Sequence, residues 1–158
     1  MELNEKVTDF TLQTDADTTA SLSDYAGKPV VLFFYPRANT PGCTIEACGF
    51  RDTFTKLQEA GAVVLGISRD TPKAQKKFKE KYDLPYMLLA DVDEVVCKQF
   101  DVLKEKNMYG KKVWGIERTT FLIGPDQTLL HVFPKVKPAG HAEEVLALLN
   151  EWKTANKQ

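Results

Sequence analysis

Two cysteines that lie close together are the residues of this chain best suited to chemistry. Cys43 and Cys48 are five positions apart, and Cys43 directly follows Pro41-Gly42. Because Pro41 and Gly42 keep a helix from starting earlier, we expect Cys43 in the first helical turn. The unpaired N–H groups and the positive end of the helix dipole favour a thiolate at that position. The pattern therefore indicates a reactive thiol at Cys43.

The spacing also limits how the two sulfurs can react with each other. In an intact helix, residues five positions apart have Cα atoms about 8.6 Å from one another. A disulfide needs Cα atoms within about 7 Å. A Cys43–Cys48 disulfide therefore requires the first turns of the helix to unwind. If the pair is redox-active, the start of the helix must exist in both a helical and an unwound state.

Each cysteine also has a structural interpretation, because a helical cysteine is most often a small buried hydrophobic residue. We prefer this interpretation for Cys97, since nothing around it marks a reactive thiol. For Cys48 it stays open. For Cys43 it is weaker, because Pro-Gly-Cys at a helix start has no evident packing purpose.

The histidines do not suggest a metal or protease site. The chain has two, His131 and His141, and neither is spaced with a cysteine pair as zinc ligands are. No local signature supports a Cys–His protease pair. We expect both histidines at the surface or at a strand edge, with no metal bound.

Composition excludes several other classes of protein. The 158 residues are 43% apolar, which suits one domain with a sizeable core. The net charge of −1 argues against nucleic-acid binding. The longest apolar run, residues 30–35, is far shorter than the roughly 20 residues of a membrane span. With no apolar signal segment and only three cysteines, we expect a cytoplasmic protein without a disulfide scaffold.

Strands and helices are expected to alternate around the cysteines. Residues 29–35 and 62–68 are continuous apolar runs, typical of buried strands. The helix between them has an apolar stripe with spacings of three and four residues: Ala47, Phe50, Phe54 and Leu57. Thr71 is expected to cap a second helix that begins at Pro72.

The remaining pattern completes an α/β fold. Further strands are expected at residues 10–13, 87–90, 114–123 and 127–133, and further helices at residues 93–100 and 142–152. The β-α-β-α-β start and the hairpin-helix finish indicate a three-layer α/β/α sandwich with a mixed central sheet. We predict a single domain over residues 1–158.

The segment around Cys43 resembles the active site of a known family. Pro36-x-x-x-Thr40-x-x-Cys43 is similar to the peroxiredoxin motif, and residues 41–52 resemble its bacterioferritin-comigratory-protein (PrxQ) branch. The similarity covers almost the whole chain and includes residues 115–123. It implies a thioredoxin-like fold with an added N-terminal β-hairpin. It also implies an enzyme that reduces hydrogen peroxide and organic hydroperoxides with electrons from thioredoxin or a similar dithiol.

The resemblance also implies roles for individual residues. The thiolate of Cys43, the peroxidatic cysteine, attacks the peroxide and becomes a sulfenic acid. Arg118 stabilises the thiolate and the charge on the leaving oxygen. Thr40 places its hydroxyl against the sulfur and the peroxide, and Pro36 shields the pocket from water. No metal or organic cofactor is needed.

Cys48 is the implied resolving cysteine. It forms an intramolecular disulfide with Cys43, which a thioredoxin-type dithiol then reduces. No cysteine follows Cys97, so a resolving cysteine near the C-terminus of a partner subunit is not available. Cys97 is a less favoured alternative resolver. Because resolution is internal, we expect a monomer.

Some assignments near the site stay open. From spacing alone, Arg118 would be a surface strand arginine paired with Glu117 or with an acid on the neighbouring strand, and only the resemblance gives it a catalytic role. Glu46 either hydrogen-bonds within the site or complements the helix dipole. Trp114 and Tyr35 are expected to pack near the site.

Two other functions compete with a peroxidase. A thiol–disulfide oxidoreductase normally has C-x-x-C, in which both sulfurs bond without unwinding, so the longer gap here argues against it. A non-catalytic redox sensor or holdase would be oxidised at Cys43 without turning over.

Overall fold

A mixed seven-stranded sheet forms the centre of the computed structural model, which describes residues 2–155 apart from the side chain of Met108. In the order β2-β1-β5-β4-β3-β8-β9, its strands are Thr19–Ser21, Thr11–Thr14, Met87–Ala90, Val63–Ser68, Val30–Phe34, Thr119–Ile123 and Leu129–Phe133. The helices are η1 (Leu22–Tyr25), α1 (Pro41–Glu59), α2 (Pro72–Tyr82), α3 (Val95–Gln99) and α4 (His141–Ala155). The predicted single domain also includes residues 1 and 156–158, which lie outside the described residues.

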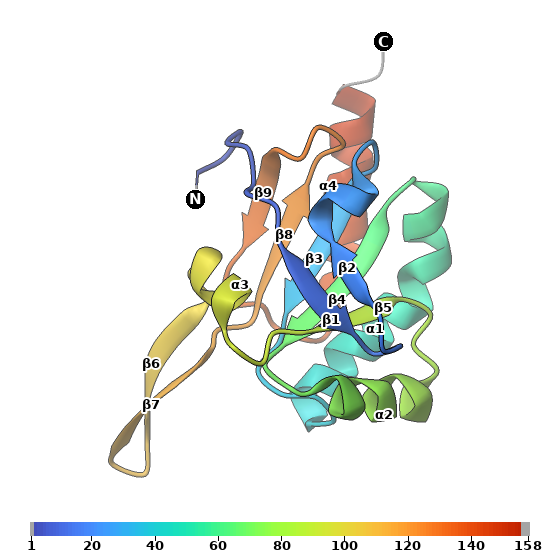
Figure 1. Cartoon of the computed structure of the whole chain (residues 1–158). Coiled ribbons are helices and arrows are strands. Elements are labelled where there is room, and N and C mark those ends of the chain that lie inside the picture. The colour runs from blue at the N-terminus through green and yellow to red at the C-terminus, as the bar shows by residue number, and fades with distance from the viewer. Residues whose placement is uncertain (1, 156–158) are drawn as a thin grey trace.

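The central strands run parallel and the outer strands antiparallel. β3 pairs in parallel with β4, and β4 with β5, whereas β8 and β9 add antiparallel strands beyond β3. The hairpin β1–β2 extends the other edge by pairing antiparallel with β5. All five residues of β3 are buried, as its continuous apolar run predicts. The thioredoxin-like mixed sheet with an N-terminal hairpin is confirmed (Figure 1).

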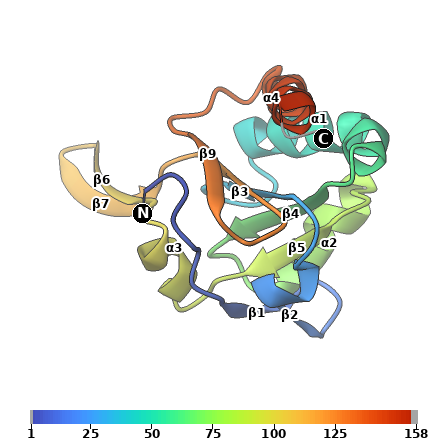
Figure 2. The ribbon, with the colours of Figure 1, turned by 90° about the horizontal axis from the view of Figure 1, so that it is seen from above.

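Helices cover both faces of the sheet and make three layers. α1 and α4 pack side by side on one face (Figure 2), and Phe78 of α2 joins the same buried cluster. On the other face, Val96 of α3 packs with Leu22 of η1 and with the N-terminal segment. Thr71 caps α2 as expected, since its hydroxyl accepts a hydrogen bond from the N–H of Ala74.

The expected single strand over residues 114–123 is wrong. The chain forms two strands there, β7 (Lys111–Ile116) and β8, interrupted at Glu117 and Arg118. The N–H of Glu117 donates to the carbonyl of Val102, and the carbonyl of Arg118 accepts from Val136. These contacts with other segments turn the chain, so that β7 pairs with β6 (Leu103–Met108) while β8 pairs with β3.

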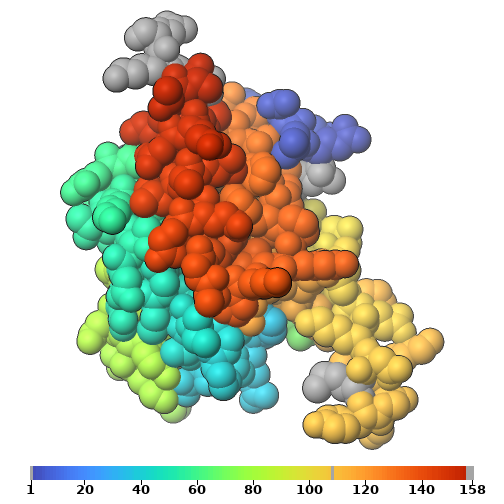
Figure 3. Space-filling view, turned by 180° about the vertical axis from the view of Figure 1, so that it is seen from behind, coloured from blue at the N-terminus to red at the C-terminus, as the bar shows by residue number. Residues whose placement is uncertain are grey.

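The β6–β7 hairpin projects from the body as a two-stranded ribbon (Figures 1 and 3). Its turn contains Tyr109 and Gly110, both at positive φ, which suits a tight hairpin turn. Trp114 lies on this ribbon with 62% of its surface exposed, so its expected packing role is wrong. Tyr35, in contrast, is fully buried.

The structure contains no membrane-spanning segment among the helices of residues 2–155, because none is both long and apolar enough.

Candidate active site

The loop after β3 delivers Cys43 to the first turn of α1. Pro41 is the first helical residue and Thr40 is the N-cap in an extended conformation, so Cys43 occupies the predicted place. Its side chain faces the core and only 1% of the residue is exposed. The thiol therefore lies at the carboxyl end of a parallel strand, where α/β sheets commonly build their sites.

Arg118 connects Cys43 to a buried carboxylate. Its Nη1 lies 3.4 Å from Cys43 Sγ and 2.9 Å from Glu46 Oε1. Burial lowers the pKa of Arg118, but the charges of Glu46 and Cys43 outweigh it and raise that pKa above its ordinary value. A guanidinium that stays charged beside a sulfur stabilises the thiolate form. The position of Arg118 in the β7–β8 interruption lets its side chain reach the helix start.

Glu46 belongs to this network rather than to the exposed first turn of the helix. It is 1% exposed, and its Oε2 has no hydrogen-bond partner. Burial raises the pKa of Glu46 to about 7, against the lowering effect of Arg118. Of the two open interpretations, hydrogen bonding within the site is the one observed.

Gly42 leaves room for the guanidinium. A Cβ atom at this position would lie 3.0 Å from Arg118 Nη2 and 3.7 Å from Cγ of Pro138, in the loop before α4. The absence of a side chain at Gly42 therefore lets Arg118 cross the helix start closely. The sequence predicted only that Gly42 delays the start of the helix. It did not indicate the close approach of Arg118 to Gly42.

Comparison with known proteins shows the family of this chain. The model of the AhpC/TSA family matches residues 3–132. A putative peroxiredoxin Bcp from Coxiella burnetii is 53% identical over 149 residues, which span 94% of this chain and 99% of the relative. The chain belongs to the peroxiredoxins of the AhpC/TSA family, in the Bcp (PrxQ) branch.

Solved structures agree with this membership. A crystal structure of a PrxQ mutant from Xylella fastidiosa is 40% identical, with a TM-score of 0.92 over 96% of this chain and 97% of that one. A bacterioferritin comigratory protein from Xanthomonas campestris is 43% identical, with a TM-score of 0.87 over 90% and 91%. Membership of this family supports a thiol peroxidase activity. It also implies peroxide substrates and a thiol reductant.

The active-site loop of this peroxiredoxin is held by its surroundings. The N–H of Ala38 donates to Asp70 Oδ2 at 2.7 Å. Asn39 has a positive φ of 61°, and its Oδ1 accepts hydrogen bonds from Lys81 and Tyr82 of α2. These contacts fix the chain just before the helix that carries Cys43.

Thr40 and Pro36 lie in the same loop. The hydroxyl of Thr40 donates to the carbonyl of Arg37 at 2.8 Å, so its proton points into the loop. Pro36 is half-buried next to the end of β3. Their catalytic roles stay predictions.

The two remaining cysteines differ in setting. Cys48 is half-buried in α1, which is continuous through both Cys43 and Cys48, and all three cysteines are free thiols. Cys97 is fully buried, and its N–H donates to Asp91 Oδ2 at 2.7 Å. Burial, followed by the neighbouring Asp91, raises the pKa of the Cys97 thiol well above its ordinary value. This setting agrees with the structural interpretation of Cys97.

The expectation that both histidines lie at the surface or at a strand edge is wrong for His141. Only 3% of it is exposed, and its Nε2 and Nδ1 lie 2.8 Å from Thr120 Oγ1 and 3.1 Å from Glu144 Oε1. Its ring packs edge-on against Phe50 of α1. His141 therefore connects α4 with β8 and α1. No local pattern in the sequence indicates these long-range contacts. His131 is half-buried on β9.

Proposed function

We propose that this chain is a thiol peroxidase with Cys43 as the peroxidatic cysteine, Cys48 as the resolving cysteine and a thioredoxin-type dithiol as the reductant. The observation that carries the proposal is the contact of Arg118 with both Cys43 Sγ and Glu46 at the first turn of α1. A charged guanidinium beside a thiol at a helix N-terminus suits a nucleophilic sulfur.

In the first step, the Cys43 thiolate attacks the nearer peroxide oxygen. An S–O bond forms, the O–O bond breaks, and the leaving oxygen takes a proton to become water or an alcohol. Arg118 is placed to stabilise the negative charge that develops on the leaving oxygen. The Thr40 hydroxyl, whose proton is donated to the carbonyl of Arg37, positions the peroxide by accepting a hydrogen bond from it, and Pro36 limits access of water.

In the second step, α1 unwinds at its start and Cys48 attacks the sulfenic sulfur. The S–S bond forms and the hydroxyl leaves as water. An external dithiol then reduces the disulfide by thiol exchange. The continuous helix through two free thiols is the starting state that this cycle needs.

Hydrogen peroxide and organic hydroperoxides are the proposed substrates. The similar Xanthomonas campestris protein has been studied for alkyl peroxide reduction, which supports the organic class. Because resolution needs no second chain, we propose a monomer. We also propose a cytoplasmic location, because thioredoxin-type dithiols are kept reduced there.

A peptide map tests the proposal. Fully reduced protein receives one equivalent of hydrogen peroxide without reductant, and the thiols are blocked before digestion. We expect a Cys43–Cys48 disulfide with Cys97 still a thiol. A stable sulfenic Cys43, or a bond to Cys97, contradicts the resolving step only, whereas no oxidation within seconds contradicts the peroxidase itself. Cycling with thioredoxin and its reductase tests the reductant.

A further inference from the structure

A buried tyrosine holds the helix between the two cysteines. The hydroxyl of Tyr86 donates to the carbonyl oxygen of Ala47 at 2.7 Å. Tyr86 is 3% exposed and directly precedes β5, and Ala47 directly precedes Cys48. Burial raises the pKa of Tyr86 well above its ordinary value, so the hydroxyl keeps the proton that it donates. This hydrogen bond therefore connects the body of the protein to the segment that must rearrange.

The bond stabilises the helical form only. A Cys43–Cys48 disulfide closes a ring that contains the backbone of Ala47. Because this ring cannot close on helical geometry, the residues inside it must leave their helical φ and ψ angles. The carbonyl of Ala47 then rotates away from its helical direction, and the contact with Tyr86 is lost.

Within the ring, Arg118 also contacts Cys43 and Glu46, whereas two further contacts of α1 lie outside it. Arg51 Nη1 donates to the carbonyl of Tyr82 at 2.9 Å, and the ring of Phe50 stacks on Phe33 with centroids 4.6 Å apart. Both contacts persist when only residues 43–48 unwind. The hydrogen bond from Tyr86 acts inside the ring, so it bears directly on how readily Cys48 is released.

We propose that Tyr86 is a positioning residue that restrains the unwinding of residues 43–48 and so sets the rate at which Cys48 resolves oxidised Cys43. The proposal rests on the proposed function and adds its regulation. A restrained helix lengthens the lifetime of the sulfenic acid. A second peroxide molecule can then oxidise that sulfenic acid to a sulfinic acid, and the peroxide is reduced to water or an alcohol. Tyr86 thereby also sets the peroxide dose that inactivates the enzyme.

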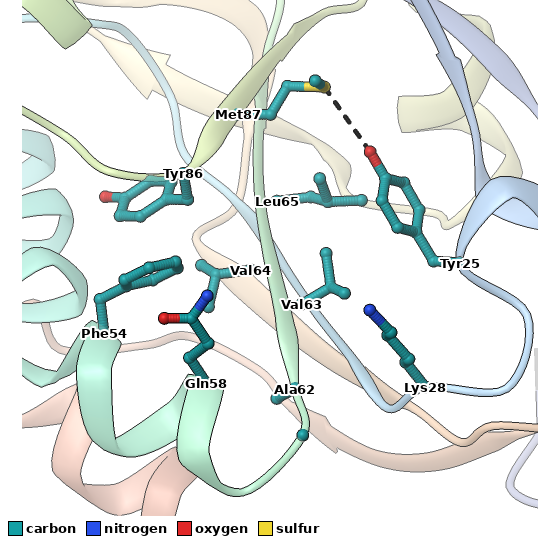
Figure 4. Close-up of a pocket in the computed structure, with 11 residues that line it drawn as sticks. Tyr25, Lys28, Phe54, Gln58, Ala62, Val63, Val64, Leu65, Tyr86 and Met87 are labelled. Atoms are coloured by element: carbon teal, nitrogen blue, oxygen red, sulfur yellow. Dashed lines mark hydrogen bonds between the residues drawn. The ribbon is translucent and has the colours of Figure 1, made fainter.

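Tyr86→Phe is the direct test, because it removes one hydroxyl and keeps the ring against Phe33 and Phe54. Tyr25→Phe is the matched control. Figure 4 shows Tyr25 across a pocket from Tyr86, with its hydroxyl directed to Met87, on the side away from α1. Reduced protein is mixed with hydrogen peroxide, quenched by acid at short times and weighed by intact mass spectrometry. The masses separate thiol, sulfenic acid, disulfide and sulfinic acid.

We expect Tyr86→Phe to convert sulfenic acid to disulfide about two- to tenfold faster, the effect of losing one net hydrogen bond from the helical state. The sulfinic fraction at high peroxide should fall accordingly, and Tyr25→Phe should behave as wild type. If the wild type forms the disulfide but Tyr86→Phe forms it at the same rate or more slowly, the proposed role of Tyr86 is wrong. The proposed function is not affected by that result. A wild type that forms no sulfenic acid overturns the proposed function instead.

Hydrogen exchange of reduced protein gives a second readout that needs no peroxide. The amides of residues 44–48 should exchange about two- to tenfold faster in Tyr86→Phe, by the same loss of one hydrogen bond. The second half of α1 should keep its protection. Equal exchange in wild type and variant, or an increase shared by all of α1, contradicts a restraint confined to the ring.

Discussion

One guanidinium nitrogen of Arg118, Nη1, donates hydrogen bonds to both the sulfur of Cys43 and the carboxylate of Glu46. This contact places a positive charge directly beside the Cys43 thiol. The side chain is 15% exposed and Glu46 is fully enclosed, so the charges interact with little screening by water. Gly42 permits the close approach. In the proposed first step, this permanent positive charge lies where negative charge develops during peroxide cleavage.

Arg118→Lys should slow the first oxidation of Cys43 by about 10²-fold. Lysine keeps the charge but lacks the planar, multiply donating group that contacts two partners. Rapid-quench mass spectrometry in a single turnover measures this rate constant. The same change at Arg69, which is ion-paired with Glu94 on another part of the surface, is the control. Equal rates in wild type and Arg118→Lys would remove Arg118 from the mechanism.

Glu46 should make stability depend on pH. Its native pKa is about 7 against an ordinary value of 4.5. Between these values the native protein binds a proton that the unfolded chain has lost, so the free energy of unfolding falls as pH rises through this window. The effect reaches about 3 kcal/mol at most. Glu46→Gln should remove it.

Urea unfolding at pH 4.5 and 7.5 measures this difference. The stability of wild type relative to Glu46→Gln should decrease as pH rises, whereas Glu59→Gln, an exposed change on the same helix, should leave the pH dependence as it is. A constant difference between wild type and Glu46→Gln across this range is incompatible with a raised pKa at Glu46.

At the scale of elements, α1 has two unequal halves. Its second half is held by Phe50 and Leu57, which are fully buried, and by the hydrogen bond of Arg51 to the end of α2. Its first half carries the exposed Ile45 and depends on the contacts of Glu46 with Arg118 and of Ala47 with Tyr86. The proposed unwinding of the first half would therefore leave the packing of the second half intact.

Cys48→Ser should separate the two steps of the cycle. Cys43 should still be oxidised, because Arg118 and the helix start are untouched, but no disulfide can follow. Sulfenic acid should accumulate and pass to sulfinic acid as peroxide increases. Intact mass and thioredoxin-linked turnover measure both effects, with Cys97→Ala as the control that cycles normally. Unimpaired turnover of Cys48→Ser would show that another group resolves Cys43.

The whole molecule combines a dense core with a projecting ribbon. Phe34 in β3 is fully buried and contacts the rings of Phe100 and Phe121. Trp114 on the β6–β7 hairpin is largely exposed and lies in a surface hollow with Arg69. Stability should therefore reside in the sheet and its helices and not in the ribbon.

Two alanine substitutions test this division. Phe34→Ala should cost about 3–5 kcal/mol of unfolding free energy, as expected for a large buried aromatic side chain. Trp114→Ala should change it by no more than about 0.5 kcal/mol, as for an exposed position. Chemical denaturation of both variants provides the values. A large loss in Trp114→Ala would mean that the ribbon is part of the cooperative core.

The sequence by itself determined what depends on neighbouring residues. The Pro-Gly start placed Cys43 in the first turn of α1, the apolar runs predicted β3 and β4, and Thr71 predicted its cap. Each of these features follows from side chains within a few positions of one another. The family motif added the fold and an expectation for Arg118 that spacing alone could not supply.

The tertiary structure decided which distant groups meet. Arg118 and Cys43 are 75 positions apart and Tyr86 and Ala47 are 39 apart, so no local period relates them. The interruption after β7 and the burial of His141 likewise depend on hydrogen bonds to other segments. Local spacing specifies a helix or a strand, whereas packing of the folded chain selects the partners of its polar side chains, and those partners decide the chemistry of Cys43.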